Sequence, residues 1–203
     1  LETHRPWKVE QLGNGYFLSR WIEDKAYKSA DGVIAVSEQM KRDVIEAYDV
    51  APEKVTVIHN GIDPEFYKPT FDTALLTEYG INPDIPFVLF VGRITRQKGI
   101  SQLIAAAKYF NTNCQIVLCA GAPDTPEIAA ETEALIAELK AQRDGVILIS
   151  EMLPREKIKI LYSHARVFAC PSLYEPFGII NLEAMACETP VVAFDCLTGP
   201  REI

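Results

Sequence analysis

The chain has 203 residues, 48% of them hydrophobic, with 20 basic and 28 acidic side chains. This composition provides a buried core for one or two domains and excludes an intrinsically disordered protein. The net charge of −8 argues against nucleic acid or an anionic membrane as the main partner, so an anionic ligand would require a local cluster of cations.

The sequence does not indicate membrane insertion or secretion. Its longest apolar runs have about six residues, whereas a membrane-spanning helix needs roughly 20, and its first residues show no signal-peptide pattern. We therefore expect a cytoplasmic protein. The five cysteines contain no C-x-x-C pair, which predicts reduced thiols in the core and no metal site.

Residues 1–62 predict two helices and two strands. In chain order, we expect a helix over Tyr16–Ser29, a strand over Gly32–Ser37, a helix over Met40–Ala47 that Ser37 caps, and a strand within Lys54–Asp63. Two strands alone do not form a stable domain. We interpret residues 1–62 as the tail of an N-terminal domain and residues 63–85 as a linker.

From Pro86 onward, short β-branched runs alternate with helical patterns, which predicts parallel βα units. The expected strands are Phe87–Val91, Gln115–Ala120, Val146–Ile149, Val167–Cys170 and Pro190–Phe194. The expected helices between them are Ile100–Phe110, Pro126–Arg143, Arg155–Ser163 and Gly178–Glu188. This order is typical of an α/β fold with a Rossmann-like, doubly wound parallel sheet. No closing helix follows the last strand, so we expect this domain, residues 86–203, to be C-terminally truncated.

The segment GRITRQKG, from Gly92 to Gly99, directly follows the first strand of this domain. Ligands of open α/β sheets bind beyond the carboxyl ends of the strands, so Arg93 and Lys98 are expected in the ligand crevice. The spacing matches neither a P-loop nor the dinucleotide fingerprint. Because no carboxylate partner is evident for these cations, they suit a diphosphate, which Arg binds by forked hydrogen bonds and Lys as a point charge. Solvated charges at a helix start are the alternative.

A second cluster lies in the segment EPFGIINLEAMA. The backbone amides of Gly178, Ile179 and Ile180 open a helix and can bind phosphate oxygens. Glu183, inside that helix, can accept hydrogen bonds from a ribose diol, and Glu175 lies nearer to whatever the phosphates carry. Exposed, solvated carboxylates are the alternative here. The two clusters are expected at the same edge of the sheet. Together they predict a nucleotide diphosphate compound as ligand.

At this point a resemblance is evident. The segments GRITRQKG, YEPFGIINLEAMA, TPVVA and VIHNGID resemble the retaining glycosyltransferases of the glycogen synthase and sucrose synthase superfamily, which have the GT-B fold. The segments RPWKVEQLGNGY and LCAGAPDTPEIAAE further resemble the actinobacterial-type glycogen synthases, which use ADP-glucose. The similarity extends from about Arg5 to Ala193.

This resemblance implies a role for each matching residue. Arg93 and Lys98 would bind the donor diphosphate and stabilise it as it leaves, Glu183 would bind the ribose, and Glu175 the sugar hydroxyls. The remaining donor contacts implied by the family are Gly92, the amides of Phe177, Gly178, Ile179 and Ile180, the segment Glu151, Met152 and Leu153 beside the base, and Asn60 and Gly61 beside the sugar. The chain contains no D-x-D sequence, and we expect no metal ion and no cofactor.

The resemblance implies transfer of glucose from ADP-glucose to an α-1,4-glucan with retention of configuration. The acceptor-side glycine-rich loop and histidine of the family are absent from this sequence, so we expect a donor-binding fragment that is inactive alone. Glycogen, maltodextrin and glucose 1-phosphate remain possible acceptors. TGPRE also occurs in related transferases, so a UDP- or GDP-sugar donor is an alternative, as is a non-catalytic nucleotide- or glucan-binding module. An epimerase is disfavoured, because epimerases of this fold do not resemble EPFGIINLEAMA closely.

Overall fold

A computed structural model describes residues 5–196 and 198–203. They form two compact units. The first unit comprises the described part of Leu1–Gly61 with Tyr174–Gly178 and Asp195–Ile203, and the second comprises Ile62–Leu173 and Ile179–Phe194. Within these ranges, no helix combines the length and apolarity that crossing a membrane requires.

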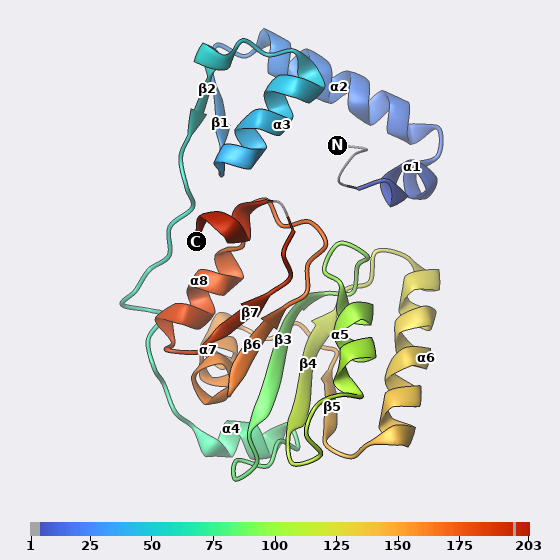
Figure 1. Cartoon of the computed structure of the whole chain (residues 1–203), viewed down its shortest axis with the longest axis vertical. Helices are drawn as coiled ribbons and strands as arrows, with labels where there is room; N and C mark the ends of the chain where they lie inside the picture. The colour runs from blue at the N-terminus through green and yellow to red at the C-terminus, as the bar shows by residue number, and fades with distance from the viewer. Residues whose placement is uncertain (1–4, 197) are drawn as a thin grey trace. The chain divides into compact units, whose positions relative to one another are not determined.

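The second unit contains a five-stranded parallel sheet with the strand order β5-β4-β3-β6-β7 (Figure 1). Its strands are β3 (Phe87–Arg93), β4 (Gln115–Gly121), β5 (Val146–Ile149), β6 (Val167–Cys170) and β7 (Val191–Ala193). The chain adds strands on one side of β3 as far as β5, and then returns to add β6 and β7 on the other side. This topology confirms the expected doubly wound α/β fold.

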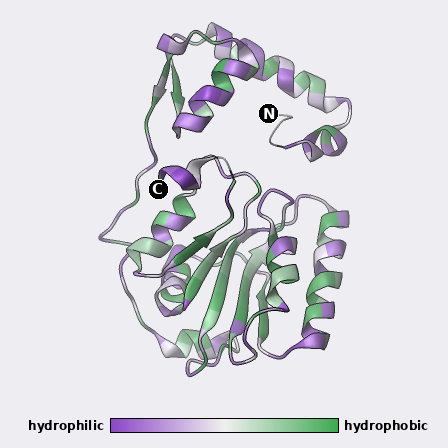
Figure 2. Ribbon diagram, viewed as in Figure 1, coloured by the Kyte–Doolittle hydropathy of each residue, from purple (hydrophilic) through white to green (hydrophobic). Residues whose placement is uncertain are grey.

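Helices cover both faces of this sheet. Successive side chains of β3 point to opposite faces, so neighbouring residues of this strand pack against different helices. Leu89 lies in a buried cluster with residues of α7 (Arg155–His164) and α8 (Ile179–Ala186), and Phe90 lies in another with residues of α5 (Ile100–Ala107) and α6 (Pro126–Gln142). Figure 2 shows the strands as predominantly hydrophobic and the helices as mixed. Such continuous apolar strands are expected when both faces of a parallel sheet are buried.

The predicted strands of this unit agree with the structure to within two residues at each end. The largest difference in a predicted helix of this unit is at α5, which ends at Ala107 instead of Phe110. The amides of Tyr109 and Phe110 donate to carbonyls three residues earlier, so the helix tightens into a turn there.

A short helix, α4 (Thr73–Glu78), lies in the segment 63–85 for which the sequence suggests a linker. Asp72 caps it by accepting hydrogen bonds from the amides of Ala74 and Leu75. Leu76 and Ile81 are fully buried in the cluster that contains Leu89. The segment thus packs within the second unit, and the domain boundaries inferred from the sequence stay a prediction.

The first unit contains a parallel pair of strands, β1 (Val33–Ala35) and β2 (Val55–Val57). Its helices are α1 (Trp7–Leu12), α2 (Gly15–Ser29), α3 (Glu38–Tyr48) and the 3-10 turns η1 (Pro52–Lys54) and η2 (Gly199–Glu202). Ser37 caps α3 as predicted, since its hydroxyl accepts a hydrogen bond from the amide of Met40 at 3.1 Å. Neither α1 nor η2 was predicted from the sequence.

The five cysteines are free thiols, and all except Cys114 are buried. Burial raises the pKa of the Cys119 thiol to about 12, so this group stays protonated at neutral pH. The thiols therefore serve as core residues, as the sequence predicts.

Candidate functional site

The strand order reverses between β3 and β6, and the loops that follow these two strands touch each other. The amide of Leu173 donates to the carbonyl of Gln97 at 2.9 Å. Gly99 lies so close to Pro171 that a Cβ atom on Gly99 would be 1.9 Å from the Pro171 carbonyl oxygen. The GRITRQKG loop is therefore held at the topological switch point, where open α/β sheets bind their ligands.

Arg93 ends β3, and its guanidinium is paired with a carboxylate. Its Nη1 lies 3.0 Å from Oδ1 of Asp124, in the loop after β4. The expectation that neither cation has a carboxylate partner is therefore wrong for Arg93. Asp124 lies 31 positions further along the chain, so only the pairing of β3 with β4 brings the two groups together. The Arg93 side chain remains 62% exposed, so it is oriented by the pair and still accessible to a ligand.

Lys98 is positioned by its own loop. Its backbone amide donates to the hydroxyl and the carbonyl of Thr95, which is buried. Its aliphatic chain passes Gly92, where the added Cβ atom would be 3.6 Å from Cγ of Lys98. Both cations of the loop thus start from fixed backbone at the end of β3.

A pocket of about 250 Å³ opens beside Arg93. Its lining combines Ile158 of α7 with residues at the ends of β3, β4 and β5, namely Val91, Gly92, Arg93, Cys119, Gly121, Ala122, Glu151, Met152 and Leu153. The structure therefore brings together Gly92, Arg93 and the segment Glu151–Leu153, which the sequence analysis placed in one site. The lining is mainly apolar with charged groups at Arg93 and Glu151, which suits a flat ring held beside an anionic group.

Glu183 projects from α8 and is held by two tyrosines. It accepts hydrogen bonds from the Tyr67 hydroxyl at 2.8 Å and from the Tyr162 hydroxyl at 3.3 Å. Burial and the bond to Glu183 raise the pKa of Tyr67 to about 12, and burial also raises the pKa of Tyr162. Both hydroxyls therefore remain donors at neutral pH. A carboxylate accepts up to about four hydrogen bonds, so a fixed Glu183 retains acceptor capacity for a ligand.

Tyr67→Phe is expected to weaken nucleotide binding by about threefold to tenfold, because Glu183 loses the donor that fixes its orientation. The variant should also change alkaline stability. A raised native pKa means that the neutral hydroxyl stabilises the fold below pH 10, and that this contribution is lost as the pH rises through about 12. The difference in free energy of unfolding between wild type and Tyr67→Phe should therefore shrink over that range. Tyr109→Phe is the matched control, since Tyr109 is 80% exposed.

Of the remaining predicted site residues, Ile179 and Ile180 begin α8 in the second unit, whereas five belong to the first unit, namely Asn60, Gly61, Glu175, Phe177 and Gly178. There the ring of His59, next to Asn60, stacks on the ring of Phe177 with centroids 5.3 Å apart. The amide of Glu175 donates to the Thr198 hydroxyl at 3.3 Å. A Cβ atom on Gly199 would lie 2.1 Å from Cα of Phe177, so only glycine fits beside this loop. The structure therefore joins the HNG and EPFG segments through Phe177.

Glu202 of η2 anchors this arrangement to α3. Its carboxylate accepts hydrogen bonds from the amides of Glu38 and Gln39 at 2.7 and 3.1 Å, and it lies 3.4 Å from Nε2 of His59. An anion at a helix N-terminus is favoured by the unpaired amides there. These amide bonds and His59 lower the pKa of Glu202 against the opposing effect of burial. The TGPRE segment thus contacts both loops, because Glu202 lies beside His59, next to Asn60, and Gly199 packs against Phe177.

Several of these residues escaped the sequence analysis, namely Asp124, Tyr67, Tyr162, Thr198 and Glu202. Each of them contacts a residue that is distant in the sequence, and no sequence motif indicates which residue that is. Within the described residues, no group of three or more His, Cys, Asp or Glu could hold a metal ion.

The fold is that of the GT-B glycosyltransferases. The chain belongs to the family described as glycosyl transferases group 1, whose model matches residues 72–203, and a model described as Glycosyltransferase Family 4 matches residues 3–66. The expectation of a GT-B glycosyltransferase is confirmed, whereas the retaining mechanism and the assignment to the ADP-glucose glycogen synthases stay predictions.

Two curated relatives are similar to most of this chain. The chain is 52% identical over 199 residues to "Alpha-maltose-1-phosphate synthase" of Mycolicibacterium smegmatis, covering 96% of this chain and 51% of the relative. It is 32% identical over 177 residues to "D-inositol 3-phosphate glycosyltransferase" of Xylanimonas cellulosilytica, covering 84% of this chain and 42% of that protein. The chain thus spans about half the length of the curated relatives it matches.

Solved structures agree with this assignment. Anabaena HepE in complex with UDP and glucose is 27% identical with a TM-score of 0.76, over 87% of this chain and 47% of that one. Sucrose-phosphate synthase of Thermosynechococcus elongatus is 31% identical with a TM-score of 0.71, over 86% and 43% of the two chains.

Proposed function

We propose that this chain supplies the donor-binding part of a retaining glycosyltransferase that transfers glucose from ADP-glucose. The observation that carries the proposal is the fixed placement of Arg93 and Lys98 at the switch point of the sheet. These two cations lie at the site where a nucleotide diphosphate is expected in an open α/β sheet. The complex of HepE with UDP and glucose supports a nucleotide-sugar donor.

The proposed chemistry follows from charge. When the bond between the sugar and the leaving diphosphate breaks, positive charge grows on the sugar carbon and negative charge on the diphosphate. Arg93 and Lys98 then bind the transition state more strongly than the ground state, because the leaving group gains charge beside them. In this proposal they stabilise the leaving group without a metal ion.

The carboxylates have different roles in this proposal. Glu183, oriented by Tyr67 and Tyr162, accepts hydrogen bonds from the ribose, and Glu175 accepts them from the hydroxyls of the transferred sugar. The nucleotide base occupies the pocket beside Arg93, whose mainly apolar lining includes Met152 and Leu153. Glu175 does not act as a glycosidase-type nucleophile, since that chemistry needs two carboxylates on either side of the reacting bond.

The acceptor proposed from the sequence alone was an α-1,4-glucan. The 52% identical maltose-1-phosphate synthase favours glucose 1-phosphate instead, because adding one glucose to that acceptor gives a maltose 1-phosphate. We therefore propose a phosphorylated sugar as acceptor, with glycogen or maltodextrin as the second candidate.

Calorimetric titration of the chain with ADP, UDP and GDP tests the donor. We expect ADP to bind more tightly than the other two. A preference for UDP or GDP would keep a nucleotide-sugar donor and reject ADP-glucose. A folded chain that binds none of the three would contradict the proposed donor site.

A non-catalytic nucleotide-binding module is the competing function. It would bind the nucleotide as well, so binding alone does not distinguish it. The distinguishing measurement is release of ADP from ADP-glucose in the presence of glucose 1-phosphate, carried out with the longer protein that contains this sequence. Absence of turnover in a protein that binds ADP would favour the module.

A further inference from the structure

The N-terminus of α3 is capped by a residue that lies far away in the sequence. The backbone amides of Glu38 and Gln39 donate to Oε2 and Oε1 of Glu202, at 2.7 and 3.1 Å. The next amide, that of Met40, donates to the hydroxyl of Ser37. Glu202 therefore completes the cap that Ser37 begins, and the unpaired amides and the helix dipole both favour a carboxylate at this place.

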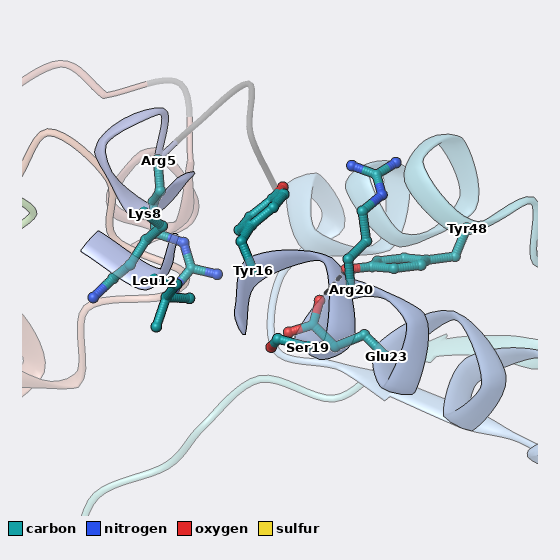
Figure 3. A pocket seen from close by; sticks show the side chains of 8 residues that line it. All are labelled: Arg5, Lys8, Leu12, Tyr16, Ser19, Arg20, Glu23 and Tyr48. Atoms are coloured by element: carbon teal, nitrogen blue, oxygen red, sulfur yellow. Dashed lines mark hydrogen bonds between the residues drawn. The ribbon is translucent and has the colours of Figure 1, made fainter. Parts of the chain in front are cut away.

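The other end of α3 is fixed as well. There the hydroxyl of Tyr48 donates to the carboxylate of Glu23, which extends from α2 (Figure 3). Val44 and Tyr48 also lie in the buried cluster of the first unit, together with residues of β1 and β2. Because α3 is anchored to this core and to α2, it is a rigid support, and its contact with Glu202 fixes the TGPRE segment in place.

The TGPRE segment connects Glu202 to the EPFG segment. The hydroxyl of Thr198 accepts a hydrogen bond from the backbone amide of Glu175 at 3.3 Å. Gly199 lies so close to Phe177 that an added Cβ atom would be 2.1 Å from the Cα atom of Phe177. Both contacts involve backbone atoms of the EPFG segment, so they cannot be relaxed by rotating its side chains. A displacement of the TGPRE segment would therefore displace the EPFG segment with it.

A second connection runs through His59, which lies between Glu202 and Phe177. Nε2 of His59 is 3.4 Å from Oε2 of Glu202. The ring of His59 stacks on the ring of Phe177, with their planes inclined by 23°. Burial opposes ionisation of Glu202, but the hydrogen bonds from α3 and the neighbouring His59 lower its pKa, so it is a carboxylate at neutral pH. Glu202 thus fixes Phe177 in two ways, through Gly199 and through His59.

We propose that Glu202 is a positioning residue for the sugar of the nucleotide-sugar donor. The inference rests on the proposed function, in which Glu175 accepts hydrogen bonds from that sugar. Glu175 is only 8% exposed, so the direction of its carboxylate depends on the backbone that carries it. A displacement of about 1 Å in such a site can cost roughly a hundredfold in rate. Glu202 acts on the sugar site through Thr198 and His59, without touching the donor itself.

Titration of the chain with ADP and with ADP-glucose tests this role. The residues proposed to bind the nucleotide belong to the second unit, namely Arg93, Lys98 and Glu183. Glu202→Gln keeps the length of the side chain and one acceptor oxygen. It should weaken binding of ADP-glucose by about threefold to tenfold and change the affinity for ADP by less than about twofold. Equal weakening of both ligands would indicate a merely structural role and overturn the proposal, as would unchanged binding of ADP-glucose.

Glu46→Gln is the matched control, since Glu46 is an exposed carboxylate on the same helix, α3. It should leave both affinities unchanged, and thermal unfolding verifies that each variant is folded. If this control weakened ADP-glucose binding as much as Glu202→Gln does, loss of charge alone would explain the data and the proposal would be wrong. A wild type that binds neither ligand would contradict the proposed function and this inference together. A wild type that binds ADP but not ADP-glucose would contradict the sugar contacts, and this inference with them.

His59→Phe tests the connection through His59. The new ring can still stack on Phe177, whereas the nitrogen beside Glu202 is lost. The double variant Glu202→Gln/His59→Phe should weaken ADP-glucose binding by less than the product of the two single effects, because both substitutions break the same contact. Single effects that multiply in the double variant would mean that the two residues act independently, and the proposed coupling of Glu202 to the sugar site through His59 would be overturned.

Discussion

Replacing Arg93 and Lys98 together with alanine is expected to weaken ADP binding by roughly a hundredfold to ten-thousandfold. Each charge-assisted hydrogen bond contributes about 1.5 to 3 kcal/mol, and every 1.4 kcal/mol is about tenfold in affinity. The two side chains start from one short loop that Gly99 and Leu173 hold against the end of β6. Calorimetric titration of wild type and variant gives the ratio of dissociation constants directly.

Asp124 adds a detail to this prediction. In the free protein its carboxylate takes one of the donors of Arg93, so binding a diphosphate must displace or share that contact. Arg93→Ala also leaves Asp124, which is only 14% exposed, without the guanidinium beside it. The negative potential of Asp124 then acts directly on the diphosphate. The single Arg93 variant should therefore lose more affinity than the single Lys98 variant.

Arg96→Ala is the matched control for this experiment. Arg96 lies in the same loop and carries the same charge as Arg93, but its side chain is 55% exposed and lies 3.9 Å from Glu131. We expect its loss to change ADP affinity by no more than about twofold, since exposed, distant charges are screened. If Arg96→Ala weakened binding as much as Arg93→Ala, general electrostatic attraction would explain the data and the specific role of Arg93 would be wrong.

The sequence predicted the second unit well because burial dominates its strands. Phe87–Arg93 and Gln115–Gly121 are almost entirely apolar, which indicates a strand buried on both faces regardless of what the neighbours are. The loop after such a strand has its place fixed by topology, so Arg93 could be assigned to the crevice without coordinates. The pairing of Arg93 with Asp124 could not be predicted, because the sequence does not indicate which loop lies next to Arg93.

Other parts of the site depend on contacts that local patterns do not contain. Tyr67 lies in a segment that reads as a linker because of its prolines, yet its hydroxyl reaches Glu183, 116 positions away. Glu202 occupies the N-terminus of α3 across 164 positions. A capping residue is normally sought beside its helix, so no inspection of the residues around Ser37 would have identified Glu202.

Gly99→Ala is expected to destabilise the second unit by about 3 kcal/mol or more, at the upper end of single-substitution effects. Two costs add at this position. Gly99 has a φ of 65°, which disfavours any residue with a Cβ atom, and that atom would lie 1.9 Å from the carbonyl oxygen of Pro171. The contact is with backbone at the end of β6, so it cannot be relieved by a change of side-chain rotamer. Denaturant unfolding of the variant measures the loss.

Gly80→Ala separates these two costs. Gly80 has a φ of 72°, similar to that of Gly99, but an added Cβ atom meets nothing within 4 Å. It should therefore lose only the conformational cost of about 1 to 2 kcal/mol, and the excess in Gly99→Ala measures the close approach of the GRITRQKG loop to Pro171. Because the same approach fixes Arg93 and Lys98, Gly99→Ala should also lower ADP affinity while Gly80→Ala leaves it unchanged. Equal destabilisation by the two substitutions would mean that the loop does not touch β6 in solution, and the geometric basis of the donor site would be lost with it.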